Sequence, residues 1–196
     1  MDATGNIIML NGASSSGKTS ILRALQNLLE EPYLDAGIDK FIWMLPKRYL
    51  DRPLWNDVLG LAVEPGQTGR RLFSGMHRAI AGLALAGNNV LADHVLVEPT
   101  WVNECAGLFC TLPSYLVGIR CPLALLEERE RSRKDRTLGQ ARAQFPLVHA
   151  HGIYDLEVDT SRLSVEECAL KIKEFLDGGT PPSAFRWLSS IRQDPL

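Results

Sequence analysis

The stretch GASSSGKT, residues 12–19, constrains the fold of this chain more than any other feature of the sequence. It follows an apolar run at 7–10 that is typical of a buried strand. It precedes a helical pattern at 21–25, although serine and glycine themselves form helices poorly. The spacing fits G-x-x-x-x-G-K-[ST], and a strand before the loop with a helix after it is the context that this motif requires. A chance Gly/Ser loop with a surface lysine is the alternative interpretation.

Each position of this loop has a physical task. The glycines let the backbone turn its N–H groups inward, and the helix that follows adds unpaired N–H groups and the positive end of its dipole. Lys18 can reach the β- and γ-phosphates, and Thr19 offers a hydroxyl to Mg²⁺. The loop therefore predicts a site for ATP and Mg²⁺. The predicted nucleotide-binding residues are Gly12, Ala13, Ser14, Ser15, Ser16, Gly17, Lys18, Thr19 and Ser20.

Apolar runs and helical patterns alternate along the rest of the chain. Residues 68–86 carry apolar side chains every three or four positions, which predicts a helix that Gly87 can end. Residues 165–176 repeat the pattern, with Ser164 as N-cap and Gly178 as the stop. Strands alternating with helices imply an α/β fold whose parallel sheet is covered on both faces. The expected strands are 7–10, 88–95, 114–121 and 154–160, with a weaker one at 33–37.

Composition argues against several classes of protein. Lys and Arg number 21 and Asp and Glu 23, so the net charge of −2 offers no excess of positive charge for a general nucleic-acid binder. No apolar run approaches the roughly 18 residues of a membrane span, and the cytoplasm is the expected compartment. The four cysteines form no CxxC pair and are expected to be reduced thiols. A chain of 196 residues suits one domain, placed at 1–179, with a surface extension at 180–196 that Trp187 and Leu188 can pin down.

Carboxylates at the ends of the predicted strands are the candidates for chemistry, because ligands of such sheets gather there. Asp39 can accept a proton from an acceptor hydroxyl, or it can be the N-cap of a helix that starts at Lys40. Asp35 is expected to be a turn residue. Asp93 can hold the water shell of the metal or bind the substrate.

The charged run at 127–142 has two interpretations. A solvated helix with the ion pairs Glu127–Arg131 and Glu130–Lys134 is the usual one. However, three arginines share one face of the helix and repel one another unless an anion lies there, so a lid that clamps phosphate is the other interpretation. These arginines are Arg129, Arg133 and Arg136.

Two further groups of side chains have simpler interpretations. His149 and His151 lack the carboxylate or cysteine spacing of a metal site and are expected to be loop or core histidines. An apolar and aromatic group follows Asp39, and the segment 46–69 after it has no clear helix or strand. That segment lies where an acceptor pocket would be built, although core packing explains some of the group. Its members are Phe41, Trp43, Met44, Tyr49 and Trp55.

Four stretches together resemble the chloramphenicol phosphotransferases. They are IIMLNGASSSGKTSILRALQ, YLDAGIDKFIWMLP, RERSRKDR and VHAHGIYDLEVDTS. The resemblance runs from about residue 7 to 176, whereas 50–69 and the tail after 179 depart from the family pattern. It implies a kinase that transfers the γ-phosphoryl group of ATP to a hydroxyl of the antibiotic, with a role in antibiotic resistance. It also implies a P-loop NTPase three-layer sandwich, with the five parallel strands of nucleoside-monophosphate-kinase-like folds.

The resemblance also implies roles for single residues. Asp39 matches the base that takes the proton of the acceptor, and Arg133 and Arg136 match the arginines of the lid. Asp93 matches the first of two carboxylates, while His94 stands where the family has the second. The predicted catalytic residues are Asp39, Lys18, Arg133 and Arg136, and the predicted substrate-binding residues are Asp39, Phe41, Met44 and Asp93.

A small-molecule kinase with a hydroxylated acceptor, and with no nucleic-acid or membrane partner, is thus the leading hypothesis. One alternative is an ATP-binding regulatory module that has no acceptor. Another is a kinase of a nucleotide or another metabolite, which keeps the chemistry and changes only the pocket. Phosphate accounting separates the first two, because a kinase makes a phosphorylated product in proportion to ADP.

Overall fold

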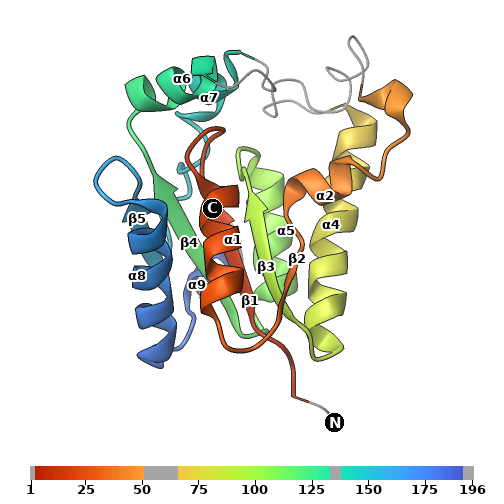
Figure 1. Cartoon of the computed structure of the whole chain (residues 1–196). Coiled ribbons are helices and arrows are strands. Elements are labelled where there is room, and N and C mark those ends of the chain that lie inside the picture. Colours follow the sequence, from red (N-terminus) through yellow and green to blue (C-terminus); the bar gives the residue numbers. More distant parts are fainter. Residues whose placement is uncertain (1–2, 51–65, 133–137, 192–196) are drawn as a thin grey trace.

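A computed structural model of the chain describes residues 3–50, 66–132 and 138–191, and these build a five-stranded sheet (Figure 1). The strand order is β2-β3-β1-β4-β5, and every neighbouring pair is parallel. The strands are β1 (Ile7–Asn11), β2 (Tyr33–Asp35), β3 (Asn89–His94), β4 (Ser114–Arg120) and β5 (Leu156–Asp159). All five lie within one or two residues of the predicted ends.

Helices cover both faces of the sheet, so the central strand β1 carries apolar side chains on both of its faces. In β1, Ile7 and Met9 belong to one hydrophobic cluster, whereas Ile8 and Leu10 belong to the other. The second cluster lies under α1 (Lys18–Leu28) and α8 (Val165–Asp177). The first lies under α4 (Gln67–Leu85), α5 (Pro99–Phe109) and α9 (Ala184–Ser190). The predicted three-layer α/β sandwich is confirmed.

Shorter helices lie over the carboxyl edge of the sheet, as Figure 1 shows. They are α2 (Ile38–Ile42), α6 (Leu123–Ser132), α7 (Gln140–Gln144) and the 3₁₀ helix η1 (Lys47–Tyr49). Parallel strands all end at this edge, so the loop after each strand delivers its side chains to the same place.

The predicted helix ends are confirmed in their local chemistry. Gly87 has φ +87° and donates its N–H to Ala84 O at 2.9 Å, which ends α4. The hydroxyl of Ser164 accepts the N–H of Glu167, and the Glu167 carboxylate accepts the N–H of Ser164, which is a capping box at the start of α8.

The described part of the tail is joined to the core. Phe185 and Leu188 of α9 are buried, whereas Trp187 is exposed. The carboxylate of Asp155, just before β5, accepts the N–H groups of Ser183 and Ala184 at 2.7 and 3.0 Å and so holds the start of α9. One face of α9 therefore packs against the core of the domain while its other face is exposed, and the division of the chain at residue 179 stays a prediction.

The cysteines Cys105, Cys110, Cys121 and Cys168 are free thiols, and three of them are buried. Within the described ranges, no group of three or more His, Cys, Asp or Glu side chains is placed to hold a metal ion. In the same ranges, no helix is both long enough and apolar enough to cross a membrane.

Candidate active site

The loop between β1 and α1 forms one wall of a cavity at the carboxyl edge of the sheet. The other walls come from α2, from the end of β3 and from α7, so the cavity joins four segments that are far apart in the sequence. The lining residues are Ser14, Ser15, Gly17, Lys18, Thr19, Ser20, Ile38, Asp39, Ile42, Asp93, Val95, Gln140 and Gln144. The cavity thus brings most of the predicted nucleotide-binding residues together with Asp39 and Asp93.

The backbone of the loop is shaped to surround an anion. Ser15 has φ +66° and Gly17 has φ +94°, so two left-handed residues turn the chain just before α1 begins at Lys18. A Cβ atom on Gly12 would lie 2.7 Å from Ile119 O, which explains the first glycine by packing as well as by turning. No side chain caps α1, and the buried hydroxyls of Ser14, Ser15 and Ser16 have no hydrogen-bond partner within the described part of the chain.

Lys18 and Thr19 already make polar contacts in this site. The buried ammonium of Lys18 donates to Gly12 O at 2.7 Å and to Ala13 O at 2.8 Å, so it lies against the loop itself. The Thr19 hydroxyl donates to Asp93 Oδ2 at 2.7 Å. Both side chains thus face the cavity that the motif predicts.

Asp93 joins the nucleotide side of the cavity to the Asp39 side. Its second oxygen, Oδ1, accepts the N–H of Ile38 at 3.0 Å, so a single carboxylate holds the starts of α1 and α2. A Cβ atom on Gly37 would lie 2.5 Å from this oxygen, so the close approach requires glycine at that position. Asp93 is buried, so these two hydrogen bonds replace contacts with water that its carboxylate loses on folding.

Asp39 lies inside α2, and the alternative that it is an N-cap is wrong. The N-cap is Gly37, whose backbone is extended, and Asp39 is the second residue of the helix. The helix begins two residues earlier than Lys40 because the Asp93 carboxylate satisfies the N–H of Ile38. The expectation that Asp35 is a turn residue is wrong, because Asp35 is the last residue of β2; its carboxylate accepts the N–H of Gly37 at 3.0 Å.

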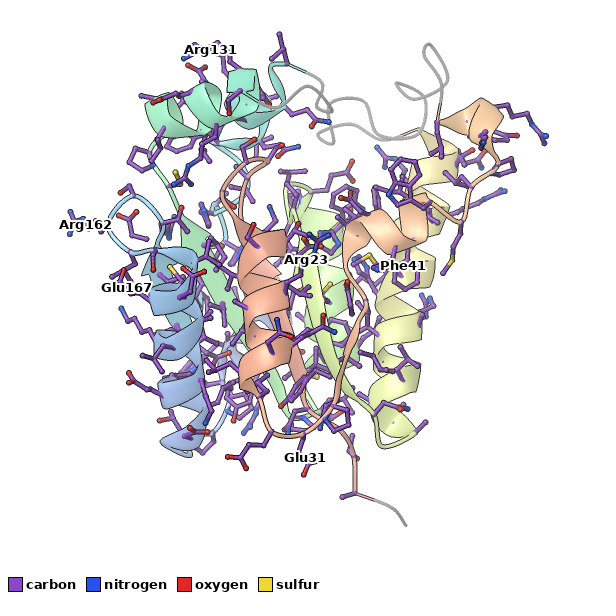
Figure 2. All side chains as sticks on the ribbon, viewed as in Figure 1. Arg23, Glu31, Phe41, Arg131, Arg162 and Glu167 are labelled. Carbon is purple, nitrogen blue, oxygen red and sulfur yellow. The ribbon has the colours of Figure 1, made fainter. Side chains whose placement is uncertain are left out.

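The aromatic group after Asp39 divides between core and surface. Phe41, labelled on α2 in Figure 2, is half-buried and packs against the core. Trp43 and Met44 are about 70% exposed, and neither they nor Phe41 line the described cavity. Trp55 lies outside the described residues. Substrate contacts of Phe41 and Met44 stay predictions.

The charged run contains different ion pairs from those that helical spacing suggests. Glu127 accepts from Arg142 Nε at 2.6 Å, while Arg131 is exposed on α6 (Figure 2), so the pair Glu127–Arg131 is wrong. Glu130 is buried, and its two oxygens accept the N–H groups of Gly139 and Ala141 at 2.8 and 2.9 Å. A burial of this kind excludes a fully solvated helix. The pair Glu130–Lys134 and the lid arginines Arg133 and Arg136 lie outside the described residues.

Arg129 supports the loop of residues 12–19 through Thr160. It donates to the Thr160 hydroxyl at 3.0 Å and to Thr160 O at 2.8 Å, and the same hydroxyl donates to Ser16 O at 3.0 Å. Arg129 therefore links α6 to the segment after β5 and to the loop. Arg129 and Thr160 also line a second cavity beside the loop, together with Leu163 and Val165.

Three polar residues in or beside this site were not predicted from the sequence. Gln144 is buried and its Oε1 accepts the N–H of Ser14 at 2.7 Å, while Gln140 lies one turn earlier on α7 and lines the same cavity. The side-chain oxygen of Asn11, just before the loop, accepts the N–H of Leu96, and its amide donates to Val148 O at 2.7 Å. Spacing alone signals only that the two glutamines share one helix face.

His149 and His151 are loop histidines, as predicted. The Tyr154 hydroxyl accepts from Asn11 Nδ2 at 2.7 Å, which leaves its own proton for His149 Nδ1 at 2.6 Å. Burial, the largest cause, lowers the pKa of His149 to about 3 and that of His151 to about 4. Both rings are therefore neutral near pH 7 and serve the packing of the segment before β5.

His94 turns away from the cavity, although its neighbour Asp93 lines it. The Val95 N–H donates to His94 Nδ1 at 2.7 Å, so the proton of this ring is on Nε2 and points at His77 Nε2, 2.8 Å away. His77 Nδ1–H then donates to Glu104 Oε2 at 2.9 Å. Burial holds the pKa of His77 below and that of His94 well below the ordinary value. His94 reaches the loop only through its backbone oxygen, which accepts the N–H of Gly12 at 3.3 Å.

Comparison with known sequences identifies relatives along nearly the whole chain. Residues 5–177 match the family model described as "Chloramphenicol phosphotransferase-like protein". Two curated proteins of Mycobacterium tuberculosis, from strains CDC 1551 and H37Rv, are each 34% identical to this chain over 197 residues. These cover 94% of the chain and 88% of the relative. Both relatives bear the name "Putative O-phosphotransferase".

Solved structures with the same fold are kinases and related proteins. A sugar kinase from Janibacter sp. superposes with a TM-score of 0.67 at 15% identity, covering 89% of this chain and 95% of that one. The APS kinase of Mycobacterium tuberculosis gives 0.61 at 17% identity, covering 89% and 99%. The tunicamycin resistance protein of Deinococcus radiodurans gives 0.63 at 16% identity, covering 91% and 98%. With its P-loop, its five parallel strands and this family match, the chain belongs to the chloramphenicol phosphotransferase-like family, as a phosphotransferase enzyme that acts on a hydroxyl group.

Proposed function

We propose that the enzyme transfers the γ-phosphoryl group of ATP to a hydroxyl of a small molecule, with a chloramphenicol-like antibiotic as the first acceptor to test. The observation that supports this most is the single cavity lined by Lys18, Thr19, Asp39 and Asp93. Groups for phosphate, for a metal and for a proton face the same space there. Phosphoryl transfer depends mostly on positioning and charge compensation, which such a convergence can supply.

The loop binds the triphosphate in this proposal. The start of α1 has no side-chain cap, so its backbone N–H groups are the proposed donors to the phosphates, and the serine hydroxyls packed within the loop lie beside them. Lys18 exchanges its contacts with Gly12 O and Ala13 O for the β- and γ-phosphate oxygens. This exchange is favourable because an ammonium binds a charged phosphate oxygen more strongly than a neutral carbonyl.

The residues next to the loop fit Mg²⁺. This ion prefers oxygen ligands and keeps several water molecules, and the Thr19 hydroxyl lies 2.7 Å from the Asp93 carboxylate. Bound there with the nucleotide, Mg²⁺ would neutralise charge on the phosphates. Thr19 would be its ligand, and Asp93 would hold its water shell while continuing to fix α2 through the N–H of Ile38.

The adenine of ATP is proposed to occupy the second cavity, which shares Ser15, Gly17 and Ser20 with the first. The Arg129 guanidinium, which Thr160 fixes, and the apolar side chain of Val165 both line this cavity. A flat aromatic ring can pack against them there. A base in this position leaves the γ-phosphate in the cavity that contains Asp39.

Asp39 is the proposed base and orienting group for the acceptor hydroxyl. Its helix is fixed at the N-terminus by Asp93, so the distance between the carboxylate and the phosphate site does not depend on a flexible loop. Accepting the proton as the oxygen attacks contributes about 10²–10⁴-fold for groups of this kind. Arg133 and Arg136 are proposed to compensate the charge of the transferring group.

Phosphate accounting tests this function. Purified protein is incubated with ATP and Mg²⁺ and with a panel of hydroxylated antibiotics and metabolites, chloramphenicol first. ADP and phosphorylated product are measured together by mass spectrometry. We expect one added phosphoryl group per ADP for at least one acceptor, and neither product with the variant Lys18→Ala. ADP that appears with free phosphate and no phosphorylated acceptor would favour the regulatory module.

A further inference from the structure

Helix α7 presents two glutamines to the cavity, and they differ in how they are held. Gln140 and Gln144 are four residues apart, so they lie on the same face of the helix. The carboxamide of Gln144 is fixed by the N–H of Ser14. Gln140 is only 6% exposed, yet its carboxamide has no hydrogen-bond partner within the described residues. Its polar atoms are open to the cavity, unlike the sealed hydroxyls of the loop.

A buried amide in this position needs a hydrogen-bond partner, which a ligand in the cavity can supply. A carboxamide offers two N–H donors and an oxygen acceptor, and burying it without partners is unfavourable. Water can satisfy Gln140 while the cavity is open. An acceptor that fills the cavity displaces this water, and it binds well only if it supplies a hydrogen bond in return.

The rest of the cavity narrows the chemistry of that acceptor. Asp39 and Asp93 are negatively charged, and Lys18 is the cation among the described lining residues, where it faces the phosphate site. Among the described lining residues, an anionic group beside Gln140 would therefore meet like charges and find no second cation, while Arg133 and Arg136 are proposed to act on the transferring phosphoryl group. Ile38, Ile42 and Val95 provide an apolar surface next to the carboxylates.

We infer that Gln140 determines acceptor specificity. It binds a second, uncharged hydrogen-bonding group of the acceptor, such as a hydroxyl, carbonyl or amide, while Asp39 binds the hydroxyl that is phosphorylated. The acceptor class is thus a molecule with an apolar part and at least two uncharged polar groups. This inference rests on the proposed function, because it takes the cavity as the acceptor site.

Equilibrium binding measures this role without requiring transfer. The protein is saturated with Mg·ADP, and calorimetry compares chloramphenicol with 3-(4-nitrophenyl)propan-1-ol. This probe keeps the aromatic ring and the primary hydroxyl but lacks the second hydroxyl and the amide. We expect the wild-type protein to bind chloramphenicol at least about tenfold more tightly. In Gln140→Met, which keeps the size of the side chain, chloramphenicol should lose most of this advantage while the simple alcohol binds as before.

A matched variant controls for general damage. Gln26 on α1 donates to Tyr33 O and lies outside the cavity lining, so Gln26→Met should leave both affinities unchanged. Gln140→Asn keeps the amide on a shorter side chain and should fall between wild type and Gln140→Met, which provides a test if the methionine variant folds poorly. Equal affinities of wild type for the two probes would overturn the inference, and so would equal chloramphenicol affinity in wild type and Gln140→Met. Discrimination without phosphoryl transfer would instead contradict the proposed function and leave the binding role intact.

Discussion

The buried pair His77 and His94 predicts that the protein loses stability as the pH falls below 6.5. Each ring nitrogen in the chain from Glu104 to the Val95 N–H has a fixed role, so an added proton places two N–H groups against each other. The pKa of both histidines is held below 6.5 in the folded protein, chiefly by burial. The unfolded chain therefore binds protons first as the pH decreases, and this favours unfolding.

The expected magnitude follows from the pKa of the unfolded chain. A histidine with an unfolded pKa of about 6.5 that stays neutral in the fold costs about 1.4 kcal/mol of stability at pH 5.5, relative to pH 8. For the pair, the upper limit is about 3 kcal/mol. Above pH 6.5 the contribution is fully present, and it is lost as the pH falls toward the folded pKa values.

Urea unfolding followed by circular dichroism, at pH 8.0 and 5.5, measures this loss. His94→Gln should be less stable than wild type at pH 8.0, yet the decrease between the two pH values should shrink by about 1.4 kcal/mol, because the titrating group is gone. His149 and His151 contribute equally in both proteins and cancel. An undiminished pH dependence in the variant would refute this reasoning.

Further variants test the loop, the lid and the close approach at Gly37. Lys18→Ala should keep the fold and lower turnover by orders of magnitude, and an unchanged rate in a coupled ADP assay would contradict the role of the loop. The double variant of Arg133 and Arg136 to Ala should lower kcat more than it weakens ADP binding, and a wild-type kcat would leave the two arginines without a role in transfer. Gly37→Ala should cost about 1–3 kcal/mol in thermal unfolding and reduce kcat, because the new Cβ displaces Asp93. Gly82→Ala, with open space around its Cβ, is the control and should not destabilise.

Features that depend on local spacing could be predicted from the sequence. The buried strands, the nucleotide loop between 10 and 20 and the capping box at Ser164 each need only a pattern of neighbouring residues. The strand order could not be read from periodicity, because the central strands β1 and β3 bury apolar side chains on both faces, and only the resemblance to a known family implied it.

Contacts that join distant segments could not be predicted from the sequence, and the reason is physical. Asp93 holds the N–H of Ile38, 55 positions away, and no local pattern encodes that distance. Glu130 was expected to pair with a lysine one turn along, but its carboxylate instead accepts two backbone N–H groups at the start of α7. Gln140 lies in a charged segment whose composition is typical of a solvated helix. Only the fold around Gln140 shows that this residue is buried.

Asp39 is the central residue of the proposed chemistry, and Asp39→Asn tests it most directly. The change is nearly isosteric and lies inside α2, whose start is held by Asp93, so the fold and the nucleotide loop should persist. The measurement compares the affinity for Mg·ATP with the rate of phosphoryl transfer to an acceptor of the wild-type enzyme. We predict near-normal ATP affinity and at least about a hundredfold loss of transfer, because an amide cannot accept the proton of the acceptor hydroxyl. Transfer at the wild-type rate would contradict the proposal and would leave Asp93 as the next candidate for the base.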